Sequence, residues 1–79
     1  MKLPELKAAL QKLQSDRPDL FEGVLVVSHY EKITNVPGFI DSHITALEAN
    51  PGNRTFMPFY DRLVRLHEIL TEKAKGNLN

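Results

Sequence analysis

Hydrophobic positions in the first part of the chain recur with helical spacing. Four leucines are separated by three, four and three residues, which places them along one narrow stripe of a helix. These are Leu3, Leu6, Leu10 and Leu13. Pro4 is compatible with a first helical turn, and Pro18 favours an end, because the residue before a proline avoids the helical conformation. The pattern predicts a helix from about Leu3 to Gln14.

The periodicity changes between residues 18 and 34. The run Gly23-Val24-Leu25-Val26-Val27 is continuous and rich in β-branched side chains, which is typical of a strand. We therefore expect an extended arm over about residues 18–34. A single strand leaves N–H and C=O groups unpaired on both edges, so the arm should be short and partly covered. Pairing with the same strand of a second copy is the alternative.

Helical patterns return in two later segments, joined by Asn50-Pro51-Gly52-Asn53. Asn35 can cap a helix over about residues 36–49, and Asn53 or Thr55 can cap a longer one over about 54–74. Proline and glycine between them stop the first of these helices. Because the link is short, we expect the two helices to form an antiparallel hairpin. The polar residues 75–79 should fray.

Each of these two helices has an apolar face. The first comprises Val36, Ile40, His43, Ile44 and Leu47, and the second comprises Phe56, Phe59, Tyr60, Leu63, Leu66, His67 and Leu70. Three of the four phenylalanines lie on these helices, so we expect the two helices to form the heart of the fold and to pack through their ring-bearing sides. The predicted fold is mainly α. It is a small three-helix domain over residues 1–79, with an extended arm between the first helix and the antiparallel hairpin of the second and third.

The segment of residues 32–63, KITNVPGFIDSHITALEANPGNRTFMPFYDRL, resembles a family of small uncharacterised bacterial proteins. The resemblance rests on five short runs within it. They are Ile33-Thr34-Asn35-Val36, Phe39-Ile40-Asp41-Ser42-His43, Ala49-Asn50 with Gly52-Asn53, Phe56-Met57-Pro58-Phe59 and Arg62-Leu63. The segment as a whole covers about 40% of the chain. The resemblance implies a bacterial, cytoplasmic protein, and it carries over no catalytic residue, cofactor or partner.

Composition narrows the function classes. The 79 residues contain no cysteine, which excludes disulfides and thiolate metal sites. The longest apolar run, residues 24–27, is too short to cross a membrane, and the first residues lack the apolar core of a signal peptide. We therefore expect a soluble cytoplasmic protein without a cofactor. No phosphate loop, nucleophile elbow or paired-carboxylate pattern is present, so we do not expect an enzyme or infer a small-molecule substrate.

His43 and Tyr60 form a candidate buried polar pair. Each lies about seven residues from the turn on an apolar face, so the Tyr60 hydroxyl can reach the His43 imidazole. A structural bond is one reading, and a pH-sensitive contact is the other, since imidazole titrates near neutrality. His67 is offset from His43 by roughly 10 Å along the hairpin, which argues against a metal site between them.

The function that remains is protein–protein contact, with a second copy of the chain or with another protein. The leucine stripe and the valine arm expose more apolar surface than a small monomer easily hides. Candidate contact residues are Leu3, Leu6, Leu10, Val24 and Val26. Each of them also fits an intramolecular core.

Nucleic-acid binding in the manner of a helix-turn-helix is the alternative function. Four basic residues share much of one side of the third helix: Arg54, Arg62, Arg65 and Lys73. However, Asp61, Glu68 and Glu72 are interleaved with them, and ten basic and ten acidic residues give zero net charge. This balance lacks the positive excess that phosphate binding requires.

Overall fold

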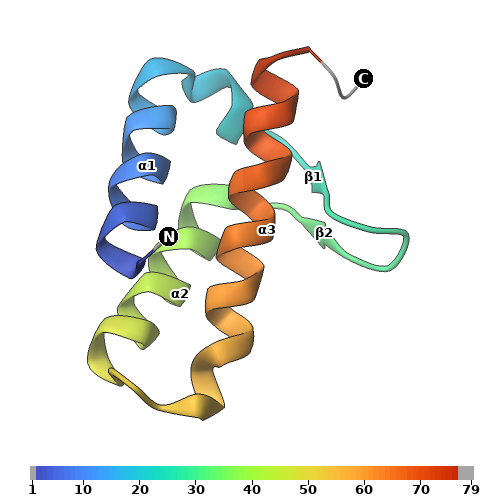
Figure 1. Cartoon of the computed structure of the whole chain (residues 1–79). Helices are drawn as coiled ribbons and strands as arrows, with labels where there is room; N and C mark the ends of the chain where they lie inside the picture. The colour runs from blue at the N-terminus through green and yellow to red at the C-terminus, as the bar shows by residue number, and fades with distance from the viewer. Residues whose placement is uncertain (1, 77–79) are drawn as a thin grey trace.

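The computed structural model describes residues 2–76, and over that range the chain forms helices and a short β-hairpin (Figure 1). In chain order the elements are α1 (Leu3–Asp16), the 3-10 turn η1 (Pro18–Phe21), β1 (Leu25–Val26), β2 (Lys32–Ile33), α2 (Val36–Ala49), the 3-10 turn η2 (Arg54–Phe56) and α3 (Met57–Ala74). The prediction of a mainly α, three-helix fold is confirmed.

Helix α1 ends two residues later than its leucine pattern indicates. Arg17 leaves the helical region with φ −136°, directly before Pro18, although its N–H still donates to the Leu13 carbonyl at 2.8 Å. The Arg17 guanidinium then donates to both carboxylate oxygens of Asp19, at 3.1 and 3.0 Å. This hydrogen-bonded pair lowers the pKa of Asp19 and raises that of Arg17. The end of α1 and the start of η1 are thereby joined.

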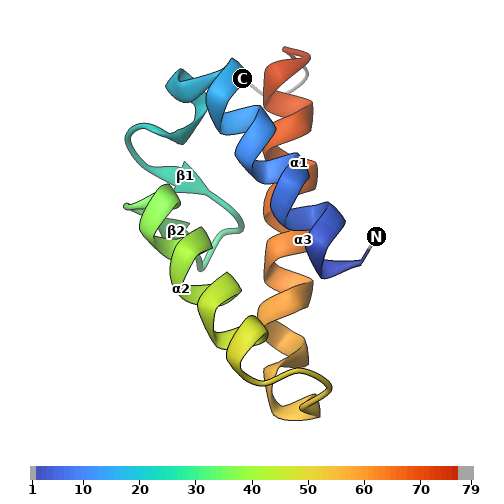
Figure 2. The ribbon, with the colours of Figure 1, turned by 90° about the vertical axis from the view of Figure 1, so that its left-hand side faces the viewer.

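Helices α2 and α3 run in opposite directions from the turn that joins them (Figures 1 and 2). The Asn35 side chain accepts from the Gly38 N–H at 3.2 Å, and the Asn53 side chain accepts from the Thr55 N–H at 2.9 Å. Both asparagines therefore satisfy N–H groups that lack a partner inside the helix. Gly52 turns the chain with φ +73°, a conformation that glycine adopts without a Cβ clash.

The C-terminal end of α3 remains hydrogen-bonded through the last described residues. The Lys75 N–H donates to the Thr71 carbonyl at 3.1 Å, and the Gly76 N–H donates to the Lys73 carbonyl at 3.1 Å. Residues 75 and 76, the first part of the tail expected to fray, thus remain bonded to the last turn of α3. Residues 77–79, the remainder of that prediction, lie outside the described residues.

The core is mainly aliphatic and is supplied by every element of the fold except η2. Its buried hydrophobic residues are Leu6, Leu10, Leu20, Phe21, Leu25, Ile33, Val36, Ile40, Ile44, Leu63, Leu66, Ile69 and Leu70. Among the described phenylalanine and tyrosine side chains only Phe21 is buried, while Phe39, Phe56, Phe59 and Tyr60 are half-buried. The ring-bearing sides of α2 and α3 do face each other, with the centres of the His43 and Phe59 rings 4.6 Å apart. The leucines of α1 and α3 occupy the centre, and the rings lie at the margin of the α2–α3 contact.

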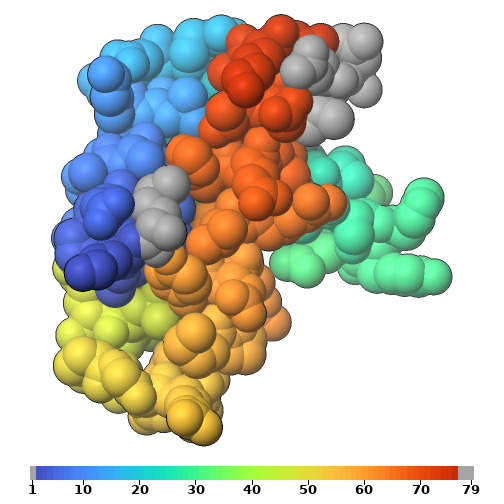
Figure 3. All heavy atoms as spheres, in the orientation of Figure 1, coloured from blue at the N-terminus to red at the C-terminus, as the bar shows by residue number. Residues whose placement is uncertain are grey.

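The valine-rich arm folds back on itself. β1 pairs with β2 in an antiparallel hairpin, with Leu25 opposite Ile33 and Val26 opposite Lys32. The partner strand thus lies at the end of the same arm. Residues 18–21, which the sequence predicts to be extended, form the 3-10 turn η1 instead, because Leu20 and Phe21 turn into the core. The hairpin projects from the side of α3, away from the helices (Figures 1 and 3).

Candidate protein-binding surface

The hairpin carries most of the exposed large hydrophobic side chains of the described residues. Four such side chains are present between residues 2 and 76: Val24, Val26, Tyr30 and Met57. The first three belong to the hairpin, with exposed fractions of 55%, 58% and 99%. We call Val24, Val26 and Tyr30 the hairpin surface.

Two inward-facing residues attach the hairpin to the core. Leu25 and Ile33 face each other across the strands, and each is about 5% exposed. Because side chains alternate between the two faces of a strand, burying Leu25 turns Val24 and Val26 outward. The same contact that anchors the hairpin therefore displays its valines.

The tip of the hairpin is held by its own backbone. The Val27 N–H donates to the Glu31 carbonyl at 2.9 Å, and the Glu31 N–H donates to the Ser28 carbonyl at 3.4 Å. The Ser28 hydroxyl accepts from the Tyr30 N–H at 3.2 Å. These bonds present Tyr30 at the end of the projection, with the His29 ring edge-on at 6.4 Å.

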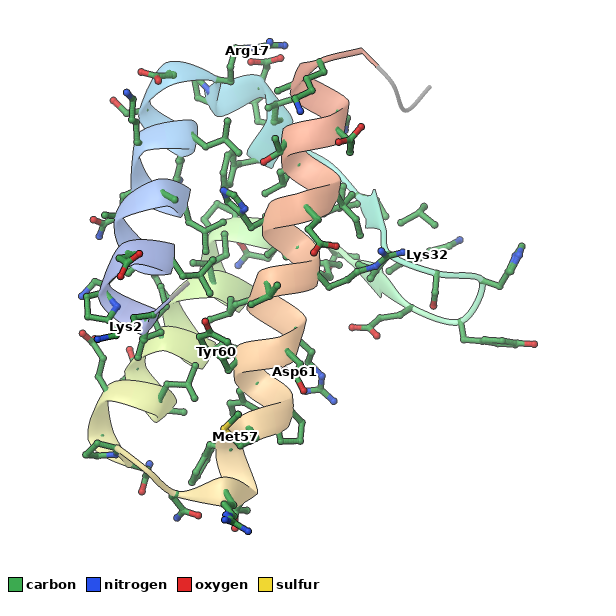
Figure 4. The ribbon with its side chains drawn as sticks, in the orientation of Figure 1. Lys2, Arg17, Lys32, Met57, Tyr60 and Asp61 are labelled. Carbon is green, nitrogen blue, oxygen red and sulfur yellow. The ribbon has the colours of Figure 1, made fainter. Side chains whose placement is uncertain are left out.

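An apolar groove lies at the opposite end of the molecule from the C-terminal end of α3. It has a volume of about 450 Å³ between the start of α1 and the α2–α3 turn. Leu3, Leu47, Met57 and Tyr60 line it, and Figure 4 shows Met57 and Tyr60 on the side of α3 that faces it. The Lys7 ammonium bridges to Glu48 at 3.1 Å between α1 and α2. Residues of all three helices therefore line or border the groove.

His43 does not bond to Tyr60. Its Nδ1 lies 2.8 Å from the Phe39 carbonyl and 3.3 Å from the Ser42 hydroxyl, and its Nε2 is buried without a partner among the described residues. The ring stacks on Phe39 at 3.9 Å and tilts against Phe59 at 4.6 Å.

The prediction that His43 pairs with Tyr60 is therefore wrong, because His43 contacts the preceding residue of α3, Phe59. Phe59 faces α2, and Tyr60 is rotated about 100° around the helix toward the groove. Counting residues from the turn correctly placed Tyr60 at about the level of His43 along the helix pair. The count does not determine which residue at that level faces the neighbouring helix.

The proposed contact residues divide into three groups. Leu6 and Leu10 are each 1% exposed and belong to the core, so they are not available to a partner. Leu3 is half-buried and lines the groove. Val24 and Val26 are exposed on the hairpin, as a contact surface requires.

The basic residues proposed for nucleic acid are spread along α3. Arg54 and Lys73 lie near its two ends, separated by roughly 25–30 Å at 1.5 Å per residue. The Arg62 guanidinium lies 5.7 Å from the centre of the Phe59 ring, and Arg65 lies 3.8 Å from Glu68. A smaller cavity of about 200 Å³ beside the hairpin is lined by Arg62 and Arg65, and also by the acidic residues Glu31 and Asp61.

Residues 2–76 contain no candidate metal site and no helix that could span a membrane. No cluster of three or more histidine, aspartate and glutamate side chains is placed to hold a metal ion. Nor is any helix in that range both long and apolar enough to cross a bilayer.

A family model matches residues 1–72 of the chain, and its description is a domain of unknown function, DUF6965. The chain belongs to this family. No curated protein and no solved structure matches it. The match confirms the expected membership of an uncharacterised family. It also extends beyond the resembling segment of residues 32–63 to include α1 and the hairpin.

Two features of this DUF6965 domain were missed in the sequence. The strand at Lys32–Ile33 has only two residues, too few to display an alternating pattern, and the sequence places Tyr30 only within an extended segment. The signal that could have found both is Ser28-His29-Tyr30-Glu31. This short, mostly polar stretch follows the apolar run 24–27 and precedes Lys32-Ile33, which is typical of a hairpin loop.

Proposed function

We propose that this DUF6965 domain is a small protein-binding module, which acts by contact and not by catalysis, and that the hairpin surface is its contact site. The observation that supports this most strongly is the concentration of exposed apolar side chains on one projecting element. Val24, Val26 and Tyr30 all lie within seven residues of sequence. Exposed apolar patches of this kind are typical of binding sites.

The fold does not account for the exposed side chains. Tyr30 is 99% exposed, so its ring removes almost no apolar area from water in the monomer. A partner that covered it would recover about 25 cal/mol for each Å² of apolar surface buried. Tyrosine is also enriched at protein interfaces, because its ring is apolar while its hydroxyl can bond at the rim.

We further propose that the protein acts in the bacterial cytoplasm. The support is the family resemblance of the segment 32–63. The absence of cysteine also means that the fold does not depend on an oxidising compartment.

The test is a comparison of partner recovery between matched variants. The triple variant Val24→Ser, Val26→Ser, Tyr30→Ser removes the hairpin surface, and Met57→Ser removes the fourth exposed hydrophobic side chain. Because all of these side chains are exposed, each substitution should change the free energy of unfolding by no more than about 0.5 kcal/mol. Proteins bound from an extract of the source cells by the immobilised wild type and by Met57→Ser should be absent with the triple variant.

The decisive result is the identity of the proteins that are lost. Partners retained equally by all three proteins would overturn the assignment of the hairpin as the contact site. Retention on mixed DNA at low salt that survives the triple substitution would favour the nucleic-acid alternative in its place.

A further inference from the structure

The hydrogen-bond pattern of the hairpin determines which backbone groups point outward. The Val27 N–H donates to Glu31 within the hairpin. Bonded and non-bonded pairs alternate along antiparallel strands, so Leu25 and Ile33 exchange bonds, while Val26 and Lys32 do not. The N–H and C=O of Val26 therefore face outward on the free edge of β1. By the same alternation, the N–H and C=O of Val24 also face outward on the β1 edge. The N–H and C=O of Lys32 face outward on the free edge of β2.

The two free edges differ in charge. Residues 23–28 on the β1 side carry no charged side chain, whereas Glu31 and Lys32 stand on the β2 side. Lysine on an edge strand opposes pairing with another strand, and two copies joined through β2 would bring their Lys32 ammonium groups together. Only the β1 edge lacks this protection. Figure 4 shows Lys32 on the projecting hairpin.

We propose that the β1 edge pairs with the β1 edge of a second copy of this chain. The inference rests on the proposed function and names the occupant of the hairpin surface. In the antiparallel register that it requires, Val24 lies opposite Val26 of the second copy, and Leu25 lies opposite Leu25. The two copies are then related by a two-fold axis that passes between their Leu25 residues. Val24 and Val26 have outward N–H and C=O groups, so each Val24 exchanges hydrogen bonds with Val26 of the second copy.

This register is self-complementary in side chains as well as in backbone. The valines of both copies join on one face, and Leu25 of each copy remains turned toward its own core. Glu22 falls opposite Ser28 of the second copy, so no like charges face each other, and the chain as a whole has zero net charge. Joining two hairpins makes a four-stranded sheet, which is more stable than an isolated pair of two-residue strands.

The first experiment removes an outward N–H and leaves the hairpin intact. Proline is tolerated on an edge strand where the N–H faces solvent, so Val26→Pro should keep the bond of Val27 to Glu31. We expect the wild type to show a concentration-dependent mass by sedimentation equilibrium, and Val26→Pro to weaken association roughly 10- to 100-fold. Lys32→Pro is the matched control, since it removes the outward N–H of the other edge, and its association should equal that of the wild type.

The second experiment tests the register and requires no proline. The chain has no cysteine, so Val24→Cys and Val26→Cys each introduce a single thiol. Directly opposed residues lie about 5.5 Å apart at Cα, within disulfide reach. Under mild oxidation an equal mixture of the two variants should give the mixed disulfide in several-fold excess over either self-linked product. Random proportions of the three products would overturn the register.

The results separate this inference from the proposed function. A wild type that stays monomeric at millimolar concentration, or a dimer that Val26→Pro and Lys32→Pro affect equally, overturns pairing through β1. Pairing through β1 could fail while the wild type binds another protein that the triple hairpin variant does not. The proposed binding function would then stand, and only the identity of the bound partner would be wrong.

Discussion

At the scale of single residues, His43 is the side chain whose environment most departs from expectation. It is buried between Phe39 and Phe59, and its Nδ1 lies 2.8 Å from the carbonyl of Phe39 in its own helix. Its Nε2 has no partner within the described part of the chain. A buried acceptor without a partner costs about 1–3 kcal/mol of the free energy of unfolding. The protein is therefore less stable with His43 than it would be with an apolar ring at this position.

We therefore predict that His43→Phe raises the free energy of unfolding by about 1 kcal/mol, because it keeps a ring between Phe39 and Phe59 and removes the unpaired nitrogen. Urea unfolding at neutral pH followed by circular dichroism measures this. His43→Ala should have the opposite sign, since it leaves a cavity. If both variants were destabilised alike, the contact of Nδ1 with the Phe39 carbonyl would outweigh the unpaired Nε2.

At the scale of elements, the start of α2 depends on Asn35 and Gly38 acting together. The Asn35 side chain accepts the Gly38 N–H, and a Cβ added at Gly38 would lie 2.5 Å from the Asn35 side-chain nitrogen. Gly38 thus leaves room for the cap. The backbone of Gly38 does not have a positive φ, so its conformation does not require glycine. Glycine is needed here because a side chain would collide with that of Asn35.

We predict that the two substitutions at this cap are coupled. Asn35→Ala should lower the free energy of unfolding by about 1 kcal/mol through loss of the cap. Gly38→Ala should be close to neutral in the wild type, because the displaced cap offsets the better helix propensity, and should stabilise by up to about 1 kcal/mol in the Asn35→Ala background. A double-mutant cycle on thermal unfolding measures the difference. Strict additivity would show that the cap tolerates the added methyl group.

At the scale of the whole molecule, α1 is part of the core. Leu6 and Leu10 are each 1% exposed and join the cluster that Leu63, Leu66 and Leu70 supply from α3. A domain of this size has a total stability of only about 4–12 kcal/mol. The leucine stripe therefore belongs to the folding of the monomer, and the surface that remains for a partner is on the hairpin.

We predict that Leu10→Ala lowers the free energy of unfolding by about 2–5 kcal/mol, a large fraction of the total. Leu3→Ala is the control from the same stripe, and because Leu3 is half-buried at the groove its effect should be below about 1.5 kcal/mol. Chemical denaturation of both variants measures this. A Leu10→Ala protein as stable as Leu3→Ala would mean that α1 is not packed on α3 in solution.

The sequence by itself determined the elements that local chemistry controls. Leucine spacing, the asparagine caps at Asn35 and Asn53 and the Asn50-Pro51-Gly52 stop act within a few residues, so three helices could be placed from the sequence. Only the tertiary structure decided which faces meet. Whether Phe59 or Tyr60 faces His43, whether Leu10 is buried, and whether Val26 finds a strand partner at Lys32 all depend on how helices are rotated and where the chain returns. The helix contacts join residues distant in sequence, and no local pattern encodes them. The pairing of Val26 with Lys32 spans only six residues, and its one local signal is the loop between the strands.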